Sequence, residues 1–234
     1  MAKYDLIISG GTILDPANGV ETISDLGIRD GVVKWIAPDM DLAEGHDVID
    51  ASRKWVMPGH IDTHAHVASP DNYWDPALGH TMLAQGGATT FIDFAGTGRA
   101  LIDGTMRKGA GLNVASLYPM IPGSTIPDET LSKSALTDIV TCALREGCIG
   151  IKILGGYYPF TAEITSDIIS VCNDNRAYIA YHVGTKHSGS RLDGLREVPD
   201  LVGRGRLHVA HINAYCRGSI ASPNEECEES LSIL

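Results

Sequence analysis

Four histidines have the type and the spacing to bind metal ions. His64 and His66 lie two residues apart in the segment GHIDTHAH (residues 59–66). Side chains alternate between the two faces of a strand, so these imidazoles share a face and can chelate one metal ion. His182 ends a second apolar segment, and His211 ends a third. Because the carboxyl ends of parallel strands meet at one edge, we expect the four imidazoles to lie close together.

Lys152 is the only charged residue in the apolar segment CIGIKIL (residues 148–154). Burying an ammonium group is costly unless the group is paired. One interpretation is that the lysine stem reaches out of the strand end to solvent. The other is that the amine captures carbon dioxide and becomes a carbamate, an anion whose two oxygens can bridge two cations. Each histidine alone could be a core residue, so the predicted metal site depends on the whole set.

The elements that must position these residues follow two patterns. Residues 1–56 contain short strands separated by turn signals at Gly10-Gly11 and Asp30-Gly31. After Pro58, apolar strands alternate with helix-length stretches, which is typical of parallel βαβ units. We expect strands at 61–67, 89–94, 113–120, 149–154, 178–183 and 207–212, and helices near 76–85, 99–109, 128–146, 162–175, 194–203 and 223–234.

This alternation predicts an α/β fold. Residues 57–234 are expected to form an incomplete (β/α)8 TIM-type barrel of about six βα units. Residues 1–56 are expected to form the N-terminal part of a small β-sandwich. A capping box at residues 222–225 predicts that a helix begins there, close to Leu234. We therefore expect either a truncated sequence or a second polypeptide that supplies the rest of the barrel.

Composition limits the classes of partner. The sequence has 18 Lys and Arg residues against 29 Asp and Glu, a net charge of −11, which argues against a nucleic-acid surface. No segment approaches the roughly 18 apolar residues of a membrane span, and no signal peptide is recognisable. The five cysteines lack CxxC spacing, so we expect reduced thiols and a cytoplasmic location.

The combination of motifs resembles the amidohydrolase superfamily. It is most similar to the cyclic-amide branch of hydantoinases, dihydropyrimidinases and dihydroorotases. The matching features are the small N-terminal β unit, the segment PGHIDTHAH (residues 58–66), Lys152, His182 and His211. The resemblance implies two divalent metal ions, one held by His64 and His66 and the other by His182 and His211, with carbamylated Lys152 bridging them. Zinc suits these ligands best, and manganese, iron or cobalt also fit.

The resemblance also implies a reaction, the hydrolysis of a non-peptide C–N bond in a cyclic amide or ureide by a hydroxide bridging the metals. Tyr157, five residues after Lys152, would donate a hydrogen bond to the forming oxyanion, with Tyr158 as the alternative one position along. Arg191 or Arg217 would bind a substrate carboxylate. The family's general base is an aspartate on an eighth strand, and nothing in this sequence can be assigned that role.

Three neighbouring residues receive other interpretations. Asp62 shares a face with His64 and His66, and we expect it to support the ligands rather than bind metal. Cys216 is expected to be a packed thiol. His208 differs in parity from His211, so we expect it to face the helices.

Two alternatives stay open. The segment 182–218 also resembles N-acyl-D-amino-acid deacylases, a related branch with an open-chain amide substrate. The other alternative is a non-catalytic fragment or subunit that binds metal or packs against a partner. In either case we expect a small-molecule amide as substrate and no nucleic acid or membrane as partner. We also expect a homo-oligomer or a second chain that completes the barrel, because an open sheet has unpaired edges.

Overall fold

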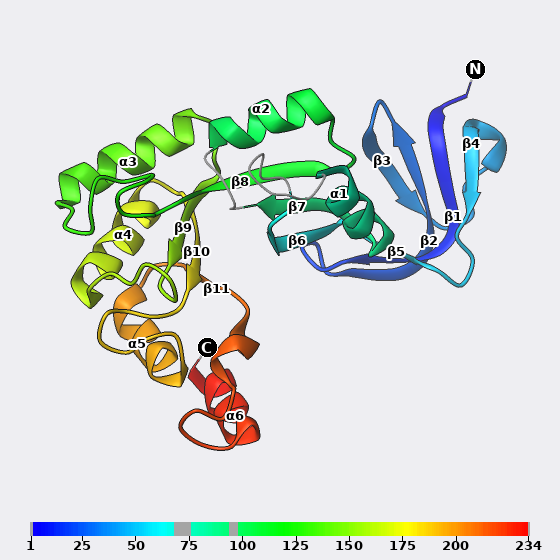
Figure 1. Ribbon diagram of the computed structural model, residues 1–234. Coiled ribbons are helices and arrows are strands. Elements are labelled where there is room, and N and C mark those ends of the chain that lie inside the picture. The colour runs from blue at the N-terminus through cyan, green and yellow to red at the C-terminus, as the bar shows by residue number, and fades with distance from the viewer. Residues whose placement is uncertain (1, 68–75, 94–97, 234) are drawn as a thin grey trace. The chain divides into compact units, whose positions relative to one another are not determined.

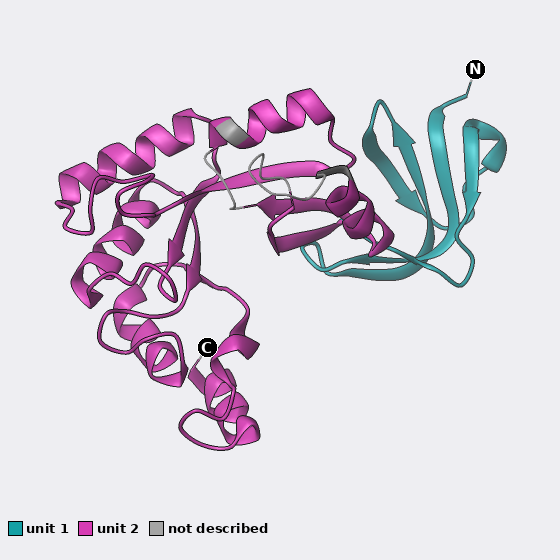
Figure 2. Cartoon of the chain, viewed as in Figure 1, with its two compact units in different colours: residues 1–59 teal, residues 60–234 magenta. Residues whose placement is uncertain are grey.

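The chain forms two compact units, residues 1–59 and residues 60–234, in a computed structural model (Figure 2). The structure describes residues 2–67, 76–93 and 98–233. The boundary at Gly59 falls directly before the segment that carries His64 and His66. All the histidines of the predicted metal site therefore belong to the second unit.

The first unit is a mixed sheet with the strand order β3-β2-β1-β4, in which β5 also pairs with β1. Asp30 and Gly31 both have positive φ and form the tight turn between β2 and β3, so the hairpin expected there is confirmed. The turn expected at Gly10-Gly11 is wrong, because β1 runs through both glycines and accommodates them with a bulge. The elements are β1 (Tyr4–Asp15), β2 (Val20–Arg29), β3 (Val32–Ala37), η1 (Leu42–Glu44), β4 (Gly45–Asp50) and β5 (Trp55–Val56).

The second unit is an incomplete (β/α)8 barrel, as expected (Figure 1). Within the described residues, six parallel strands lie side by side in chain order, from β6 at one edge to β11 at the other. The elements are β6 (His60–Ala65), α1 (Pro76–Gln85), β7 (Ala88–Asp93), α2 (Gly98–Lys108), β8 (Asn113–Pro119), α3 (Lys133–Arg145), β9 (Gly150–Leu154), α4 (Ala162–Asp174), β10 (Tyr178–His182), α5 (Leu192–Val202), β11 (His208–Val209), η2 (Ile212–Tyr215) and α6 (Pro223–Ile233). Phe94 and Leu234, the expected ends of one strand and one helix, lie outside the described residues.

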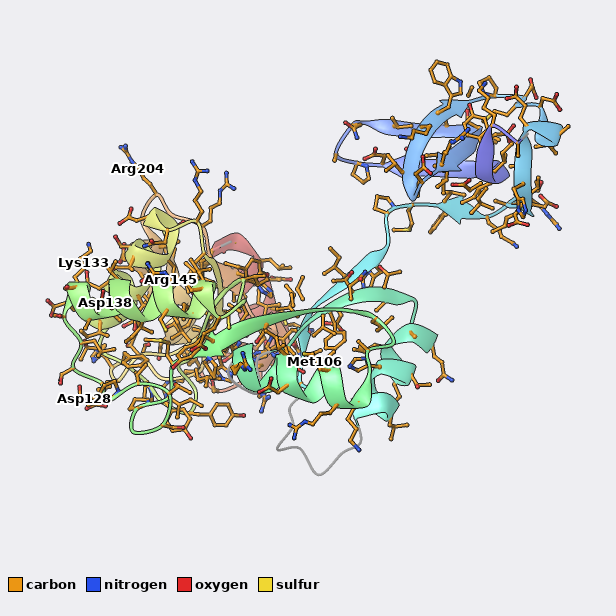
Figure 3. All side chains as sticks on the ribbon, turned by 90° about the horizontal axis from the view of Figure 1, so that it is seen from above. Met106, Asp128, Lys133, Asp138, Arg145 and Arg204 are labelled. Atoms are coloured by element: carbon orange, nitrogen blue, oxygen red, sulfur yellow. The ribbon has the colours of Figure 1, made fainter. Side chains whose placement is uncertain are left out.

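Apolar side chains pack between this sheet and the helices on its outer side. Ile151, Ile153 and Ile179 point to the helical side and form one buried cluster with apolar residues of α3, α4 and α5. Helix α3 illustrates the pattern: Leu136 and Val140 are buried, whereas its exposed polar side chains Lys133, Asp138 and Arg145 project outward (Figure 3). None of the helices in the described ranges has the length and apolar composition needed to cross a membrane.

Two elements are shorter than expected. Helix α3 begins at Lys133 rather than near residue 128, because the Ser132 side chain caps it by accepting from the Ala135 amide, 3.2 Å away. Strand β11 ends at Val209 rather than at residue 212. The chain turns at His211, whose φ of 37° lies in the left-handed region, and η2 follows at once.

Candidate metal centre

Histidines from three separated strand ends come together in the second unit. The ring centroid of His211 lies 4.5 Å from that of His182 and 4.8 Å from that of His64. His66 continues the cluster, with its ring 5.3 Å from the ring of His64. Since β6 and β11 are the two edges of the sheet, the cluster spans the curve of the incomplete barrel at its carboxyl end.

Lys152 lies below this cluster on the inner face of β9. Its Cα pairs with those of Ala180 and Pro119, and its side chain is only 1% exposed. Burial lowers the pKa of Lys152 to about 7. Burial is the main reason that the pKa values of the four clustered histidines are lowered, and the charge on Lys152 contributes to each of these shifts. The interpretation in which the lysine reaches out to solvent does not match this burial.

His182 and His211 present their ring nitrogens differently. His182 Nε2 lies 2.8 Å from Ser190 Oγ, which leaves Nδ1 as the nitrogen available to a metal ion. His211 Nδ1 is buried and has no hydrogen-bond partner among the described residues. Burial lowers the pKa of both rings, that of His182 to about 4. Both imidazoles are therefore neutral at pH 7, the form that binds metal.

The first-strand pair is held by backbone contacts from two carboxylates. Asp62 Oδ1 accepts a hydrogen bond from the His64 amide at 2.9 Å, and Asp93 Oδ2 accepts one from the Val67 amide at 2.8 Å. These bonds fix the chain on either side of the HxH motif. Burial and then the charge on Lys152 lower the pKa of His64 to about 3. This imidazole is therefore also neutral at pH 7.

Two glycines and a tyrosine follow Lys152 at the same strand end. A Cβ on Gly156 would lie 2.1 Å from His182 Nε2, so the loop can pass this ring only with glycine there. The ring of Tyr157 lies 5.3 Å from the ring of His182, and 72% of its surface is exposed. Tyr158 makes no such ring contact with a clustered histidine in the described part of the chain. Of the two tyrosines proposed for the oxyanion, Tyr157 is therefore the one beside the cluster.

The two candidate arginines differ in their partners. Arg191 forms an ion pair with Asp193, with Nε and Oδ2 separated by 3.1 Å. Arg217 is exposed and has no carboxylate within ion-pair distance among the described residues. Burial is the main reason that the pKa values of His182 and His211 are lowered, and the charge on Arg217 makes a smaller contribution to both.

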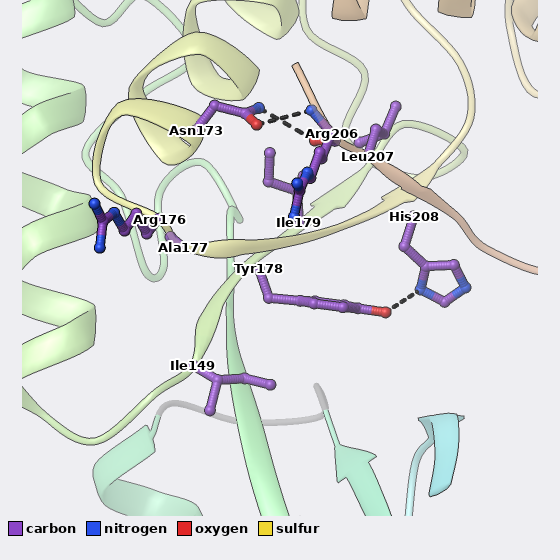
Figure 4. Close-up of a pocket in the computed structure, with 9 residues that line it drawn as sticks. All are labelled: Ile149, Asn173, Arg176, Ala177, Tyr178, Ile179, Arg206, Leu207 and His208. Atoms are coloured by element: carbon purple, nitrogen blue, oxygen red, sulfur yellow. Dashed lines mark hydrogen bonds between the residues drawn. The ribbon is translucent and has the colours of Figure 1, made fainter. Parts of the chain in front are cut away.

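His208 faces the inside of the barrel, so the expectation that it faces the helices is wrong. Its Cα pairs with that of Ala180, and its Nδ1 lies 2.8 Å from Tyr178 Oη (Figure 4). The parity argument fails because it assumed an unbroken strand as far as His211. Tyr178 and His208 line a cavity of about 710 Å³ at the amino ends of the strands, which is the end opposite to the histidine cluster.

The donor set fits divalent metal ions. Neutral imidazoles are common zinc ligands, and a carbamate on Lys152 would add two anionic oxygens. His211 Nδ1, buried without a partner among the described residues, is the kind of atom that a metal ion would satisfy. In the described ranges no three His, Cys, Asp or Glu side chains are already arranged around a common metal position.

Three residues near the cluster escape sequence reasoning. Ser190 contacts His182 from a loop eight residues later, Gly156 matters only because His182 packs on it, and Tyr215 lies beside both His182 and His211. Of these three, only Gly156 has a recognisable signal in the sequence, because it belongs to a Gly-Gly pair after an apolar strand. Cys216, by contrast, is buried as expected, with Sγ 3.1 Å from Ser230 Oγ.

Curated relatives match most of the chain. A dihydroorotase from Anaeromyxobacter dehalogenans is 30% identical over an alignment of 253 positions, which covers 97% of this chain and 58% of the relative. A D-aminoacylase from Alcaligenes xylosoxydans xylosoxydans is 26% identical over 215 residues, 75% of this chain and 43% of the relative. The chain thus spans about half the length of the relatives it matches. No family model matches the sequence.

Solved structures share the fold. The formyltransferase/hydrolase complex from Methylorubrum extorquens, solved with methylofuran, contains a chain with a TM-score of 0.70 and 20% identity, covering 97% of this chain and 52% of that one. The L-hydantoinase from Arthrobacter aurescens gives a TM-score of 0.59 at 20% identity, covering 98% of this chain and 50% of that one. The curated relatives, the motifs and the shared fold together support the amidohydrolase superfamily, on its cyclic amidohydrolase branch, as the family of this chain.

Proposed function

We propose that this chain contributes the metal centre of a hydrolase that cleaves the C–N bond of a cyclic amide or ureide. One observation carries the proposal: His64, His182 and His211 meet around a buried lysine at the carboxyl ends of the strands. In a barrel this is the end at which active sites lie. The relatives named dihydroorotase and L-hydantoinase support the choice of a cyclic substrate.

Five residues would hold the two metal ions: His64 and His66 one, His182 and His211 the other, and carbamylated Lys152 both. When bound, the metals would supply a lowered pKa for water and polarisation of the scissile carbonyl. The burial of Lys152 supports the carbamate, because a pKa of about 7 leaves much of the amine neutral at pH 7 and able to attack carbon dioxide. The amine then loses one proton and gains a carboxylate. Zinc is the metal we propose, with manganese, iron or cobalt as substitutes.

The remaining residues act on the substrate. The Tyr157 hydroxyl would donate a hydrogen bond to the oxygen of the scissile carbonyl as negative charge develops on it. Its exposure and its position beside His182 support this role. Arg217 would pair with a carboxylate of the substrate, because its guanidinium has no carboxylate partner in the described part of the chain.

Polypeptide outside the six described strands would complete the barrel and donate the aspartate that moves the proton. Strands β6 and β11 each lack a neighbour on one side within the described residues, and two more βα units would join them. A second chain or a further copy of this one could supply them, and the similarity to a chain of a multi-subunit complex supports such assembly. We also propose a cytoplasmic location, where the five cysteines, none of them disulfide-bonded here, would stay reduced.

A second candidate is the hydrolysis of an open-chain N-acyl amino acid. The similarity to a D-aminoacylase favours it, and Arg217, which has no ion pair among the described residues, suits a substrate with a free carboxylate equally well. Turnover by the assembled enzyme separates the two candidates. Hydantoin and dihydroorotate represent the cyclic class, and N-acetyl-D-amino acids represent the open-chain class. Turnover of only the open-chain substrates would replace the first proposal by the second.

Metal analysis tests the centre itself. Purified protein should contain about two divalent ions per chain, and replacing both His64 and His66 by Ala should remove them together. Lys152→Ala should abolish the activity of the assembled enzyme, and short carboxylic acids should partly restore that activity by taking the place of the carbamate. Lys133→Ala is the matched control, because Lys133 is an exposed lysine of α3. Unchanged metal content in the double histidine variant would overturn the assignment.

A further inference from the structure

Tyr215 connects the two halves of one predicted metal site. It is the last residue of η2, is 1% exposed, and accepts a hydrogen bond from the Val183 amide with its hydroxyl oxygen at 2.8 Å. Val183 directly follows His182. The phenol therefore ties the short helix after β11 to the end of β10.

The ring of Tyr215 also touches both histidines. Its centroid lies 5.6 Å from the ring of His211 and 6.0 Å from the ring of His182. His211 caps η2, and its carbonyl accepts from the Ala214 amide at 2.8 Å, so Tyr215 and His211 belong to one helical turn. One side chain thus contacts both rings and is joined to the backbone on both sides.

The far end of η2 is fixed as well. Cys216 Sγ lies 3.1 Å from Ser230 Oγ on α6. The buried carboxylate of Glu226 accepts from the amides of Gly218 and Ile220, each at 2.7 Å. Tyr215 is therefore held between the end of β10 and the contacts that join η2 to α6.

We propose that Tyr215 is a positioning residue that sets the separation of His182 and His211 for the metal ion they share. This inference rests on the proposed function. Metal affinity depends on partners that orient the ligands, and losing one such partner typically costs about 10- to 100-fold in affinity. Removing the phenol oxygen would free the end of β10 and leave the Val183 amide without its acceptor.

Tyr181 provides a matched control. It is fully buried, and its hydroxyl oxygen accepts from the Gly184 amide at 3.0 Å, one residue further along the same loop. Its ring belongs to the same buried cluster as the ring of Tyr215, so the two variants are matched in burial as well. Tyr181→Phe and Tyr215→Phe therefore remove the same group from adjacent amides, but of the two rings only that of Tyr215 packs against histidine rings among the described residues.

The test is a zinc titration of the full chain against a chromophoric chelator. The wild-type chain should bind two ions, and Tyr215→Phe should weaken one of them by about 10- to 100-fold. Tyr181→Phe should leave both affinities nearly unchanged. In a His211→Ala background, Tyr215→Phe should have no further effect, because the pair it positions is already broken.

Several results would overturn the inference while leaving the proposed function intact. These are equal zinc affinities in the wild type and Tyr215→Phe, equal losses in the two tyrosine variants, or an effect of Tyr215→Phe that persists in the His211→Ala background. A metal-free Tyr215→Phe chain that is unfolded by circular dichroism would assign the residue to fold stability instead and would also overturn it. Failure of the wild-type chain to bind zinc would refute the proposed function itself.

Discussion

The histidine cluster is carried by two groups of strands that differ in their packing. His182 lies at the end of β10 and His211 just after β11, in the group β9–β11, and His64 lies on β6 in the group β6–β8. Behind β9 and β10, residues of three helices and several loops form one continuous buried cluster. Behind β6 and β7, a separate and smaller cluster of the described residues has Ala65, Phe91 and Leu101 as its buried members. The outer helices there expose large apolar side chains, including Met82 at 64% and Met106 at 81%.

The difference concerns how each side is held in place. His182 and His211 sit on backbone that is fixed by dense packing and by side chains such as Tyr215 and Ser190. His64 sits on β6, an edge strand among the described residues, where its amide donates to Asp62 and the strand pairs with β7. We infer that the β9–β11 side provides the rigid frame and that the β6–β8 side adjusts to it when metal binds.

Replacing a core residue by alanine on each side should show the difference in packing most strongly, as a difference in lost unfolding free energy. Ile153 is fully buried in the larger cluster, so Ile153→Ala should cost about 4 kcal/mol of unfolding free energy, near the upper end for such changes. Leu101 belongs to the smaller cluster of the described residues and is 5% exposed, so Leu101→Ala should cost about 2 kcal/mol. Urea unfolding of both variants measures the two values. Equal losses would contradict the contrast in packing.

Sequence reasoning performs best where local chemistry determines the outcome. The Asp30-Gly31 turn and the order of six βα units follow from turn residues and apolar periodicity alone. It is wrong about Gly10-Gly11 and His208, because a bulge in β1 and the early end of β11 change the alternation of side chains. The roles of Ser190 and Tyr215 arise from contacts between loops, which no periodicity encodes.

The pH dependence of stability should separate Lys152 from the histidines in the metal-free chain. The pKa of Lys152 is about 7 in the folded chain and 10.5 when exposed, so between these values only the unfolded chain keeps the proton. Stability therefore rises with pH across that window. The pKa values of His64 and His182, about 3 and 4, lie below the usual 6.5, so stability also falls as the solution is acidified below pH 6.5.

Lys152→Met should remove the alkaline window and keep the acidic one. It should also raise the melting temperature at pH 7, because a buried amine is replaced by an apolar side chain of similar length. Thermal unfolding in buffer free of metal and carbon dioxide, from pH 4 to pH 10, measures both effects. A wild-type curve that is flat between pH 7 and pH 10 would contradict the buried, neutral amine.

Two glycine-to-alanine substitutions compare the β9–β11 side with the β6–β8 side by adding the same methyl group to each. Gly156→Ala would bring a methyl group to 2.1 Å from His182 Nε2, and we expect a loss of about 1–3 kcal/mol together with weaker zinc binding. Gly111→Ala, beside β8, would meet the His80 side chain at an ordinary 3.6 Å and should be tolerated. Calorimetric zinc titration and urea unfolding distinguish the variants. Normal zinc binding by Gly156→Ala would mean that the loop can move away from His182.

The smallest of the predicted effects should come from a substitution at Glu226, whose carboxylate holds the loop that follows η2. Glu226 Oε2 accepts from the Gly218 amide, and Oε1 accepts from the Ile220 and Ala221 amides at 2.7 and 3.2 Å. The Ile220 amide is the main reason that the pKa of Glu226 lies below its usual value. In Glu226→Gln one oxygen becomes an NH₂ group that cannot accept, so at least one of these amides loses its partner.

Glu197 provides the comparison, because its carboxylate accepts from the hydroxyls of Thr185 and Ser188 at 2.9 and 2.7 Å. Hydroxyls can rotate to meet an amide, whereas backbone N–H groups cannot, so Glu197→Gln should be milder than Glu226→Gln. Hydrogen exchange of the Gly218 and Ile220 amides should accelerate in Glu226→Gln while β9 and β10 stay protected. Protection that is lost equally in β9 would mean that this loop is part of the rigid frame rather than attached to its edge.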